Sequence, residues 1–189
     1  MKTETKNKKQ FIIDTAAELF KEKGYSASSV RDLAARVGLE PSSIYSHIRS
    51  KDELLNEICM CCSARFTDGM NNIYIADISP KKKVKALINL HLQIAFDFPA
   101  SVTVFNDEWK FLNKPILTEF LQARIEYENK FKKILREGQK NGKFSFINVD
   151  LVFNIIIKTL SWSYTVVNKY SKEELGNEVT AFILKAIRK

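Results

Sequence analysis

Apolar residues recur every three or four positions along almost the whole chain, the spacing that places side chains on one face of an α-helix. No stretch gives a convincing β-strand signal. Gly and Pro, which tight turns need most, number only six and four among 189 residues. Because a β-sandwich needs a turn every few residues, the sequence predicts an all-α fold.

Helical segments follow from this spacing and from the start and stop residues around them. We expect helices over residues 10–23, 30–37, 41–48, 51–74, 80–98, 101–111, 115–137, 149–169 and 172–188. The first nine residues hold four Lys against one Glu and predict a flexible basic arm. The composition changes near residue 55, so we expect a three-helix head over residues 1–55 and a larger helical body over residues 56–189.

The head has the pattern of a helix-turn-helix, in which two short helices are joined by a tight turn. Ser29 can cap the helix over residues 30–37, and Asp32 completes a capping box. Gly38 supplies the positive φ at which that helix ends, and Pro41 suits the first position of the next helix. In DNA-binding units of this kind the second helix enters the major groove. The pattern alone leaves open a helical hairpin without a DNA role.

Four short runs occur together in the head, within residues 8–58. They are Gly24-Tyr25-Ser26-Ala27-Ser28-Ser29-Val30-Arg31-Asp32-Leu33-Ala34, Val37-Gly38-Leu39, Ile44-Tyr45-Ser46-His47 and Lys51-Asp52-Glu53-Leu54-Leu55. In combination they resemble the N-terminal domain of the TetR family of bacterial transcriptional regulators. The resemblance implies an all-helical homodimer whose variable body binds a small-molecule inducer. A two-fold dimer would place its recognition helices about 34–36 Å apart and predicts a palindromic operator.

The candidate DNA-binding residues are Ser28, Ser29, Arg31, Ser42, Ser43, Tyr45, His47 and Lys51. The first three stand at the start of a predicted helix, where hydroxyls, free N–H groups and the dipole favour a phosphate. The next two begin the recognition helix, where short hydroxyls touch bases with little selectivity. For the last three, the resemblance implies contacts with the DNA backbone. Alternatively, Tyr45 packs as a core aromatic, and His47 and Lys51 are exposed surface residues.

The segment over residues 151–167 is apolar on more than one face, whereas a surface helix needs a single apolar stripe. The segment over residues 172–188 is also rich in apolar residues. Both are therefore candidates for a helical dimer interface, and the resemblance implies that the last two long helices pair into a four-helix bundle. A single buried core without dimerisation stays open.

Aromatic residues are frequent between the head and these last helices, and a few polar residues lie among them. An apolar pocket with a few polar groups is the usual form of a small-molecule site. The candidate ligand-binding residues are His91, Phe105, Trp109, Arg124, Tyr127 and Trp162. Ordinary core packing and internal hydrogen bonds are the alternative for this set.

Parts of the body are similar to a subgroup of the family. The stretches Asp107-Glu108-Trp109, Arg124-Ile125-Glu126-Tyr127-Glu128 and Gly138 to Phe144 resemble members that repress lipid and steroid degradation and respond to acyl-CoA thioesters. That resemblance implies an apolar tunnel for an acyl chain. The basic run Lys81-Lys82-Lys83, with Lys85, is then a candidate for the anionic head group, although basic runs are usually solvated.

The formal net charge is +8, which favours an anionic partner such as nucleic acid. Residues 1–60 carry ten basic and nine acidic side chains, however, so most of the excess lies outside the head. Cys59, Cys61 and Cys62 are too few and too close for a disulfide framework and suit small buried hydrophobes better than a thiol sensor. We expect a cytoplasmic protein, with no signal peptide, membrane span, cofactor or metal site.

These observations predict a ligand-responsive DNA-binding repressor that acts as a homodimer. The alternative keeps the DNA-binding head and makes the body a protein-interaction platform without an inducer. An enzyme has no support, because the sequence has no nucleophile elbow, metal pair or phosphate loop.

Overall fold

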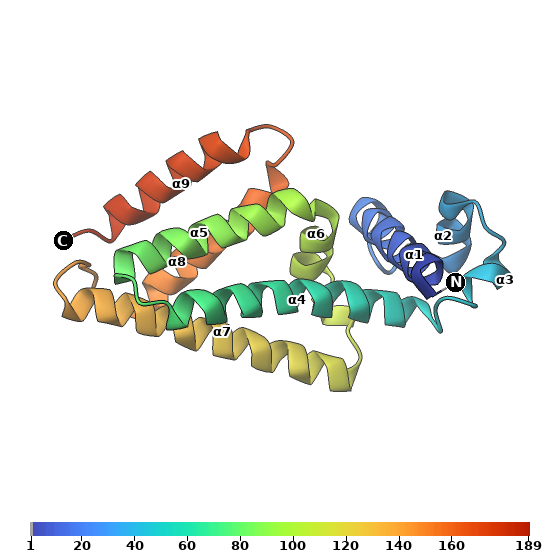
Figure 1. The fold of residues 1–189 in the computed structure, drawn as a ribbon, viewed down its shortest axis with the longest axis horizontal. Helices are drawn as coiled ribbons and strands as arrows, with labels where there is room; N and C mark the ends of the chain where they lie inside the picture. The colour runs from blue at the N-terminus through green and yellow to red at the C-terminus, as the bar shows by residue number, and fades with distance from the viewer. Residues whose placement is uncertain (1) are drawn as a thin grey trace. The chain divides into compact units, whose positions relative to one another are not determined.

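The structure is a computed structural model that describes residues 2–189, with side chains from residue 8 onward (Figure 1). Within these residues the chain forms α-helices and short 3₁₀ helices but no strand, which confirms the all-α prediction. In chain order the elements are α1 (Lys2–Lys23), α2 (Val30–Val37), α3 (Pro41–Ile44), α4 (Lys51–Ile75), α5 (Pro80–Asp97), α6 (Pro99–Asp107), η1 (Trp109–Phe111), α7 (Lys114–Lys140), α8 (Val149–Trp162), η2 (Ser163–Thr165) and α9 (Lys172–Ala186). Among the described residues, no helix combines the length and hydropathy that crossing a bilayer requires.

The signals at the ends of α2 take the predicted form. The Ser29 side chain accepts a hydrogen bond from the Asp32 N–H, and the Asp32 side chain accepts one from the Ser29 N–H, so the capping box is complete. Gly38 ends the helix in the left-handed region at φ 67°. The α1–α2 turn begins at Gly24, also at positive φ.

Three predicted helices end at least four residues early. The helix expected over residues 101–111 is α-helical only to Asp107, and η1 follows it. The helix expected over residues 41–48 is regular only to Ile44, and turns follow it. The helix expected over residues 149–169 is α-helical only to Trp162. There the Ser163 hydroxyl donates to the Leu160 carbonyl at 2.6 Å, and the Thr165 hydroxyl donates to the Trp162 carbonyl at 2.8 Å. Such local side-chain bonds to the backbone compete with helix continuation.

The first helix is longer than predicted. It begins at Lys2 instead of Gln10, so the segment expected to be a flexible arm belongs to α1 from Lys2 onward. Met1 and the side chains of residues 1–7 lie outside the described residues. The ammonium of Lys9 pairs with Glu57 and lies 3.6 Å from a carboxylate oxygen of Glu53. These ion pairs with α4 orient this end of α1 and are a physical reason for the difference.

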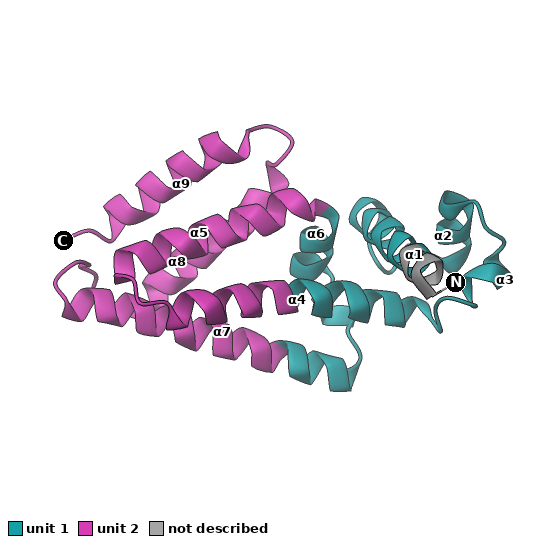
Figure 2. Ribbon diagram, in the orientation of Figure 1, with its two compact units in different colours: residues 1–63, 100–120 teal, residues 64–99, 121–189 magenta. Residues whose placement is uncertain are grey.

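The chain divides into two compact units (Figure 2). Unit 1 consists of residues 1–63 and 100–120, and unit 2 consists of residues 64–99 and 121–189. Helices α4 and α7 therefore each contribute to both units. The expected functional domains, residues 1–55 and 56–189, remain a prediction. The boundaries of the compact units differ from them because residues 100–120 pack with the head.

The core of unit 1 joins the head to residues from α6, the loop after η1 and α7. Buried side chains of α1 to α4 pack in one cluster with four residues of the later segment, Ala100, Val104, Leu112 and Phe120. Phe120 is fully buried, and Phe105 and Trp109 lie around it with ring centroids 5.2 and 6.0 Å away. The three helices of a small head bury little apolar surface alone, so these four residues enlarge the core on which the head rests.

The core of unit 2 joins α5, α7, α8 and α9, and a buried histidine, His91, pairs there with the partly buried Tyr127. The Nε2 atom of His91 lies 2.7 Å from the Tyr127 hydroxyl, and the Phe66 ring is 4.7 Å from the imidazole. His91 is only 8% exposed. Burial disfavours the charged imidazolium and lowers the pKa of His91 to about 3. The imidazole is therefore held in its neutral form at pH 7.

This burial predicts a loss of stability in mild acid. Between about pH 6.5 and pH 3, an unfolded chain protonates His91 and the folded chain does not, so the free energy of unfolding falls as the pH falls. From pH 7 to pH 5 we expect a loss of about 2 kcal/mol from this residue. Urea unfolding of the wild type and of His91→Gln at both pH values measures it. The Gln variant has no imidazole to titrate, so its free energy of unfolding should fall by about 2 kcal/mol less than that of the wild type between pH 7 and pH 5. Equal losses in the two proteins would contradict a lowered pKa of His91.

Candidate functional site

The turn before α2 is held from inside the head. The Ser28 hydroxyl donates to the Gly24 carbonyl at 2.7 Å, and Ser28 is 4% exposed. The Lys51 ammonium, at the first residue of α4, donates to the carbonyls of Tyr25 and Ser28, both at 2.9 Å. Two of the eight predicted DNA-binding side chains, Ser28 and Lys51, therefore hold the turn in this structure.

The start of α2 presents Ser29 and Arg31 at the surface. The Ser29 hydroxyl is occupied in the capping box, and the Lys23 ammonium lies 2.9 Å from the Asp32 carboxylate. Hydrogen bonds from Ser29 and Lys23 hold the pKa of Asp32 below its usual range. An ionised carboxylate at a helix N-terminus already offsets the helix dipole. A phosphate at this end of α2 would meet Arg31 and the N–H groups next to that carboxylate.

The segment from Pro41 to Ile48 separates its buried and exposed faces clearly. Ile44 and Ile48 are buried, at 0% and 2% exposure, and fix the segment on the core of unit 1. Ser42, Ser43 and Tyr45 are exposed, with Tyr45 at 57%, and His47 is half-buried. This exposure excludes core packing for Tyr45. The hydroxyls and the phenol of this segment are available to a partner at the surface.

Sequence reasoning missed the part that Tyr25 plays. This side chain is buried at 7% exposure, and its hydroxyl donates to the carboxylate of Asp52. The Phe20 ring lies 5.3 Å away and the Phe111 ring 5.5 Å away. Burial, followed by the bond to Asp52, raises the pKa of Tyr25. Tyr25 belongs to the run that resembles the family, but the spacing of apolar residues in the sequence gave no signal of these contacts.

The six predicted ligand-binding residues do not form one described cluster. His91 and Tyr127 are bonded to each other in unit 2, whereas Phe105 and Trp109 pack around Phe120 in unit 1. Arg124 lies on α7, and partial burial of its guanidinium lowers its pKa. Trp162, at the end of α8, is 49% exposed. The ligand role of this set remains a prediction.

Unit 2 has two open grooves among its described residues. The smaller, of about 420 Å³, lies between α8 and α9 and is mainly apolar; it is lined by Thr159, Trp162, Tyr170, Glu174, Leu175, Glu178, Val179 and Phe182. The larger, of about 660 Å³, lies between α5 and α9 and mixes amides and charges with aliphatic side chains. Trp162 is the one predicted ligand-binding residue that lines either of these two grooves.

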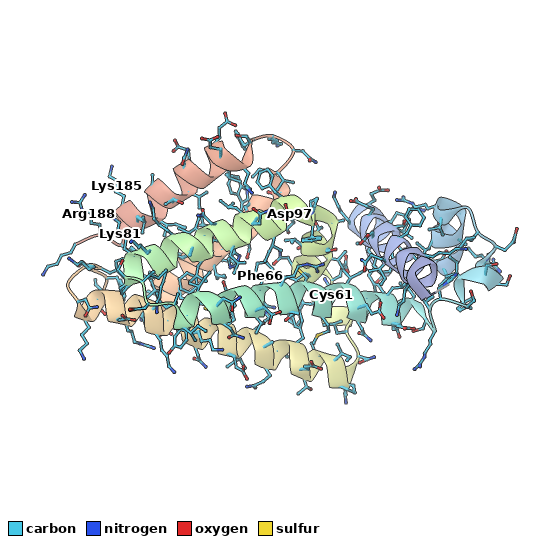
Figure 3. The ribbon with its side chains drawn as sticks, in the orientation of Figure 1. Cys61, Phe66, Lys81, Asp97, Lys185 and Arg188 are labelled. Atoms are coloured by element: carbon cyan, nitrogen blue, oxygen red, sulfur yellow. The ribbon has the colours of Figure 1, made fainter. Side chains whose placement is uncertain are left out.

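The three cysteines differ in exposure along α4. Cys59 and Cys62 are buried, whereas Cys61, which is labelled on α4 in Figure 3, is exposed. Burial, with the charge of Glu108 nearby, raises the pKa of the Cys59 thiol to about 12, which keeps it protonated and unreactive. Among the described residues, no group of three or more His, Cys, Asp or Glu side chains is placed to hold a metal ion.

Two family models match this chain. The model described as bacterial regulatory proteins, tetR family, matches residues 12–58, and the model described as the tetracyclin repressor-like C-terminal domain matches residues 77–187. The second spans more than half of the chain. The first covers α2, α3 and the exposed residues of the segment that follows the Gly38 turn.

Relatives and solved structures agree with these models. The HTH-type transcriptional repressor KstR2 of Mycolicibacterium smegmatis is 28% identical over 182 residues, which cover 93% of this chain and 88% of the relative. The structure of the ketosteroid transcriptional regulator KstR2 of Mycobacterium tuberculosis has a TM-score of 0.88 at 23% identity and covers 96% of this chain and 95% of that one.

A third protein, AibR in complex with isovaleryl coenzyme A and operator DNA, has a TM-score of 0.80 at 16% identity and covers 92% of this chain and 96% of that one. At such identities the two solved structures show the fold alone. Together with the matched family models, the helix-turn-helix and the helical body show that the chain belongs to the TetR family of bacterial transcriptional regulators, a DNA-binding family and not a family of enzymes.

Proposed function

We propose that this protein is a repressor that binds a palindromic operator as a homodimer and is released by a small apolar ligand, with an acyl-CoA thioester as the leading candidate. The observation that carries the proposal is the surface of the segment from Pro41 to Ile48. Its two buried isoleucines fix a short platform from which Ser42, Ser43 and Tyr45 project. Such a platform suits insertion into a major groove.

The exposed side chains divide naturally between bases and phosphates. Ser42 and Ser43 lie at the start of α3, where their hydroxyls would reach base edges. Tyr45 and His47 would donate to backbone phosphates, and Arg31 would bring the one cation at the start of α2. Phosphate contacts fix the register of a protein on DNA, while base contacts select the sequence. With only serines proposed at the bases, we expect shape and two-fold symmetry to supply much of the selectivity.

The proposed dimer uses the outer face of α8 and α9. Leu151, Ile155 and Trp162 follow one stripe of α8 at helical spacing and are 63%, 61% and 49% exposed, and Phe182 on α9 is 62% exposed. Trp162 and Phe182 line the same groove, and exposed apolar residues that gather in this way often mark a protein interface. A second copy would cover this face with the same residues, because a two-fold interface pairs a surface with itself.

The proposed ligand site lies in the body. An acyl-CoA is supported by the likeness of the fold to AibR, whose structure is a complex with isovaleryl coenzyme A, and by the resemblance of the body to acyl-CoA-responsive regulators. The pair of the buried His91 and the partly buried Tyr127 would provide a neutral polar point beside an apolar core. The Lys83 ammonium is engaged by the Tyr74 carbonyl at 2.7 Å, so Lys81, Lys82 and Lys85 remain for the phosphates of a CoA head group.

A second candidate function rests on the same apolar face. The groove of about 420 Å³ between α8 and α9, with Trp162 and Phe182 on its rim, would also accept a helix of another protein. The body would then be an interaction platform without an inducer. The second and third experiments below separate these functions.

The first prediction concerns the recognition segment. Tyr45→Ala should weaken binding to a duplex selected by the wild-type protein from a random-sequence pool by at least about 100-fold, because each subunit loses a bond to a charged phosphate. Fluorescence anisotropy of the labelled duplex measures the affinity. Tyr45→Phe is the matched control and should lose most of the same affinity if the hydroxyl is the donor. Unchanged affinity in Tyr45→Ala would refute the assignment of the segment.

The second prediction concerns the dimer. Phe182→Glu should convert the protein to a monomer at about 10 μM, because two carboxylates would be buried in a self-pairing apolar interface. Sedimentation velocity gives the mass. Ile147→Glu, at a fully exposed apolar position outside the face, is the control and should stay dimeric. A monomeric wild type would count against the dimer and favour the interaction platform.

The third prediction concerns the ligand. Palmitoyl-CoA should raise the apparent Kd for the selected duplex by about 5- to 150-fold, the usual range of coupling between two sites. Free CoA and palmitate at the same concentration should have little effect, since each carries only half of the recognised molecule. If palmitate alone released the protein from the duplex, the proposed ligand would be a fatty acid and not an acyl-CoA thioester. No release by any acyl-CoA would reject this ligand class.

A further inference from the structure

The first two residues of α4, Lys51 and Asp52, both contact the side chain of Tyr25 in the α1–α2 turn. Lys51 donates to the carbonyls of Tyr25 and Ser28 at 2.9 Å, and its ammonium lies 4.2 Å above the centre of the Tyr25 ring. Asp52 accepts the hydroxyl proton of the same tyrosine. We call Tyr25, Lys51 and Asp52 the Tyr25 clamp.

The clamp closes a loop that contains the whole DNA-reading unit. Residues 29–50, which include α2 and α3, lie between its two sides, and the clamp bonds span 23 to 27 positions of the sequence (Figure 1). Fixing both ends of such a loop removes much of its freedom to shift. The relative placement of α2 and α3 then depends on bonds made outside both helices.

The bonds of Lys51 leave its ammonium with little capacity for DNA. An ammonium has three donors; two go to carbonyl oxygens, and the ring face of Tyr25 lies beneath the group. A phosphate would have to displace one of these partners. If it did, one of these carbonyl oxygens would lose its bond to the ammonium next to the incoming negative charge, and that exchange is unfavourable.

We propose that Lys51 is a positioning residue of the DNA-reading unit, which acts through the Tyr25 clamp and not as a phosphate ligand. This inference rests on the proposed operator binding and assigns a different role to one residue of that site. Tyr25 and Asp52 are not placed to donate a hydrogen bond to DNA, because Tyr25 is buried and its hydroxyl donates to the Asp52 carboxylate.

The salt dependence of DNA binding separates the two roles. Each phosphate contact adds about 0.9 to the slope of log K against log salt, so a lost contact in both subunits of a dimer lowers the slope by about 1.8. Lys51→Met keeps the aliphatic stem and removes the donors. We expect it to weaken binding to the duplex selected by the wild type at least tenfold, with an unchanged slope. Arg31→Met, at an exposed cation on α2, is the matched control and should lower the slope.

Two further variants keep the test decisive if Lys51→Met folds poorly. Tyr25→Phe removes only the hydroxyl bonded to Asp52 and should also weaken binding at an unchanged slope. Its effect and that of Lys51→Met should be less than additive, because both break the same clamp. Lys51→Arg can donate to both carbonyls and should restore most of the affinity. All affinities are measured well below the unfolding temperature, where a residue that only stabilised the fold would leave them unchanged.

The outcomes distinguish this inference from the proposed function. A slope that falls in Lys51→Met as it does in Arg31→Met, with normal binding by Tyr25→Phe, would overturn the positioning role. Wild-type affinity in Lys51→Met would overturn it as well. If the wild-type protein selects no duplex from the random pool, the proposed operator binding fails first, before any variant is compared.

Discussion

The shared core of unit 1 is the constraint on which the proposed DNA-reading surface depends. A small head buries little apolar surface by itself, and here Ala100, Val104, Leu112 and Phe120 complete its core. These four residues lie within the segment that the second family model matches. Any rearrangement of residues 100–120 must therefore repack side chains that α1 and α4 also contact. Such a core supplies a physical route by which an event in that segment could reach the head.

Local chemistry made much of the fold predictable. The capping box at Ser29 and the left-handed Gly38 depend only on residues within one or two turns of a helix, so the sequence located both. The early end of α8 depends on the backbone carbonyls to which the hydroxyls of Ser163 and Thr165 donate. The periodicity of apolar residues gives no information on these hydrogen bonds. The start of α1 was missed for another reason: Lys9 is bonded to α4, more than forty positions away.

The candidate sites were predictable to different degrees. The exposure of Ser42 and Ser43 was predictable from their place at the start of the recognition helix, whereas the sequence left core packing open for Tyr45, which the structure excludes. The pairing of His91 with Tyr127 requires knowing that α5 and α7 meet, which spacing within either helix cannot tell. Family resemblance placed Lys51 near DNA, but only the geometry reveals that its donors face the α1–α2 turn. Residue identity located the group, and tertiary contacts determine what the group does.

The charges of the head support this division of roles. The sequence predicts a net charge of only +2 for residues 29–51, and the structure pairs several of the nearby cations internally: Lys9 with Glu57, Lys23 with Asp32, and Arg36 with Glu22. Non-specific attraction to DNA grows with the number of phosphates that cations neutralise. A head that commits its cations to its own framework gains little of that attraction. The proposed DNA binding would then depend on how well a rigid platform of hydroxyls fits one groove. The bonds that fix the platform, such as those of Lys51, would matter more than the charge of that residue.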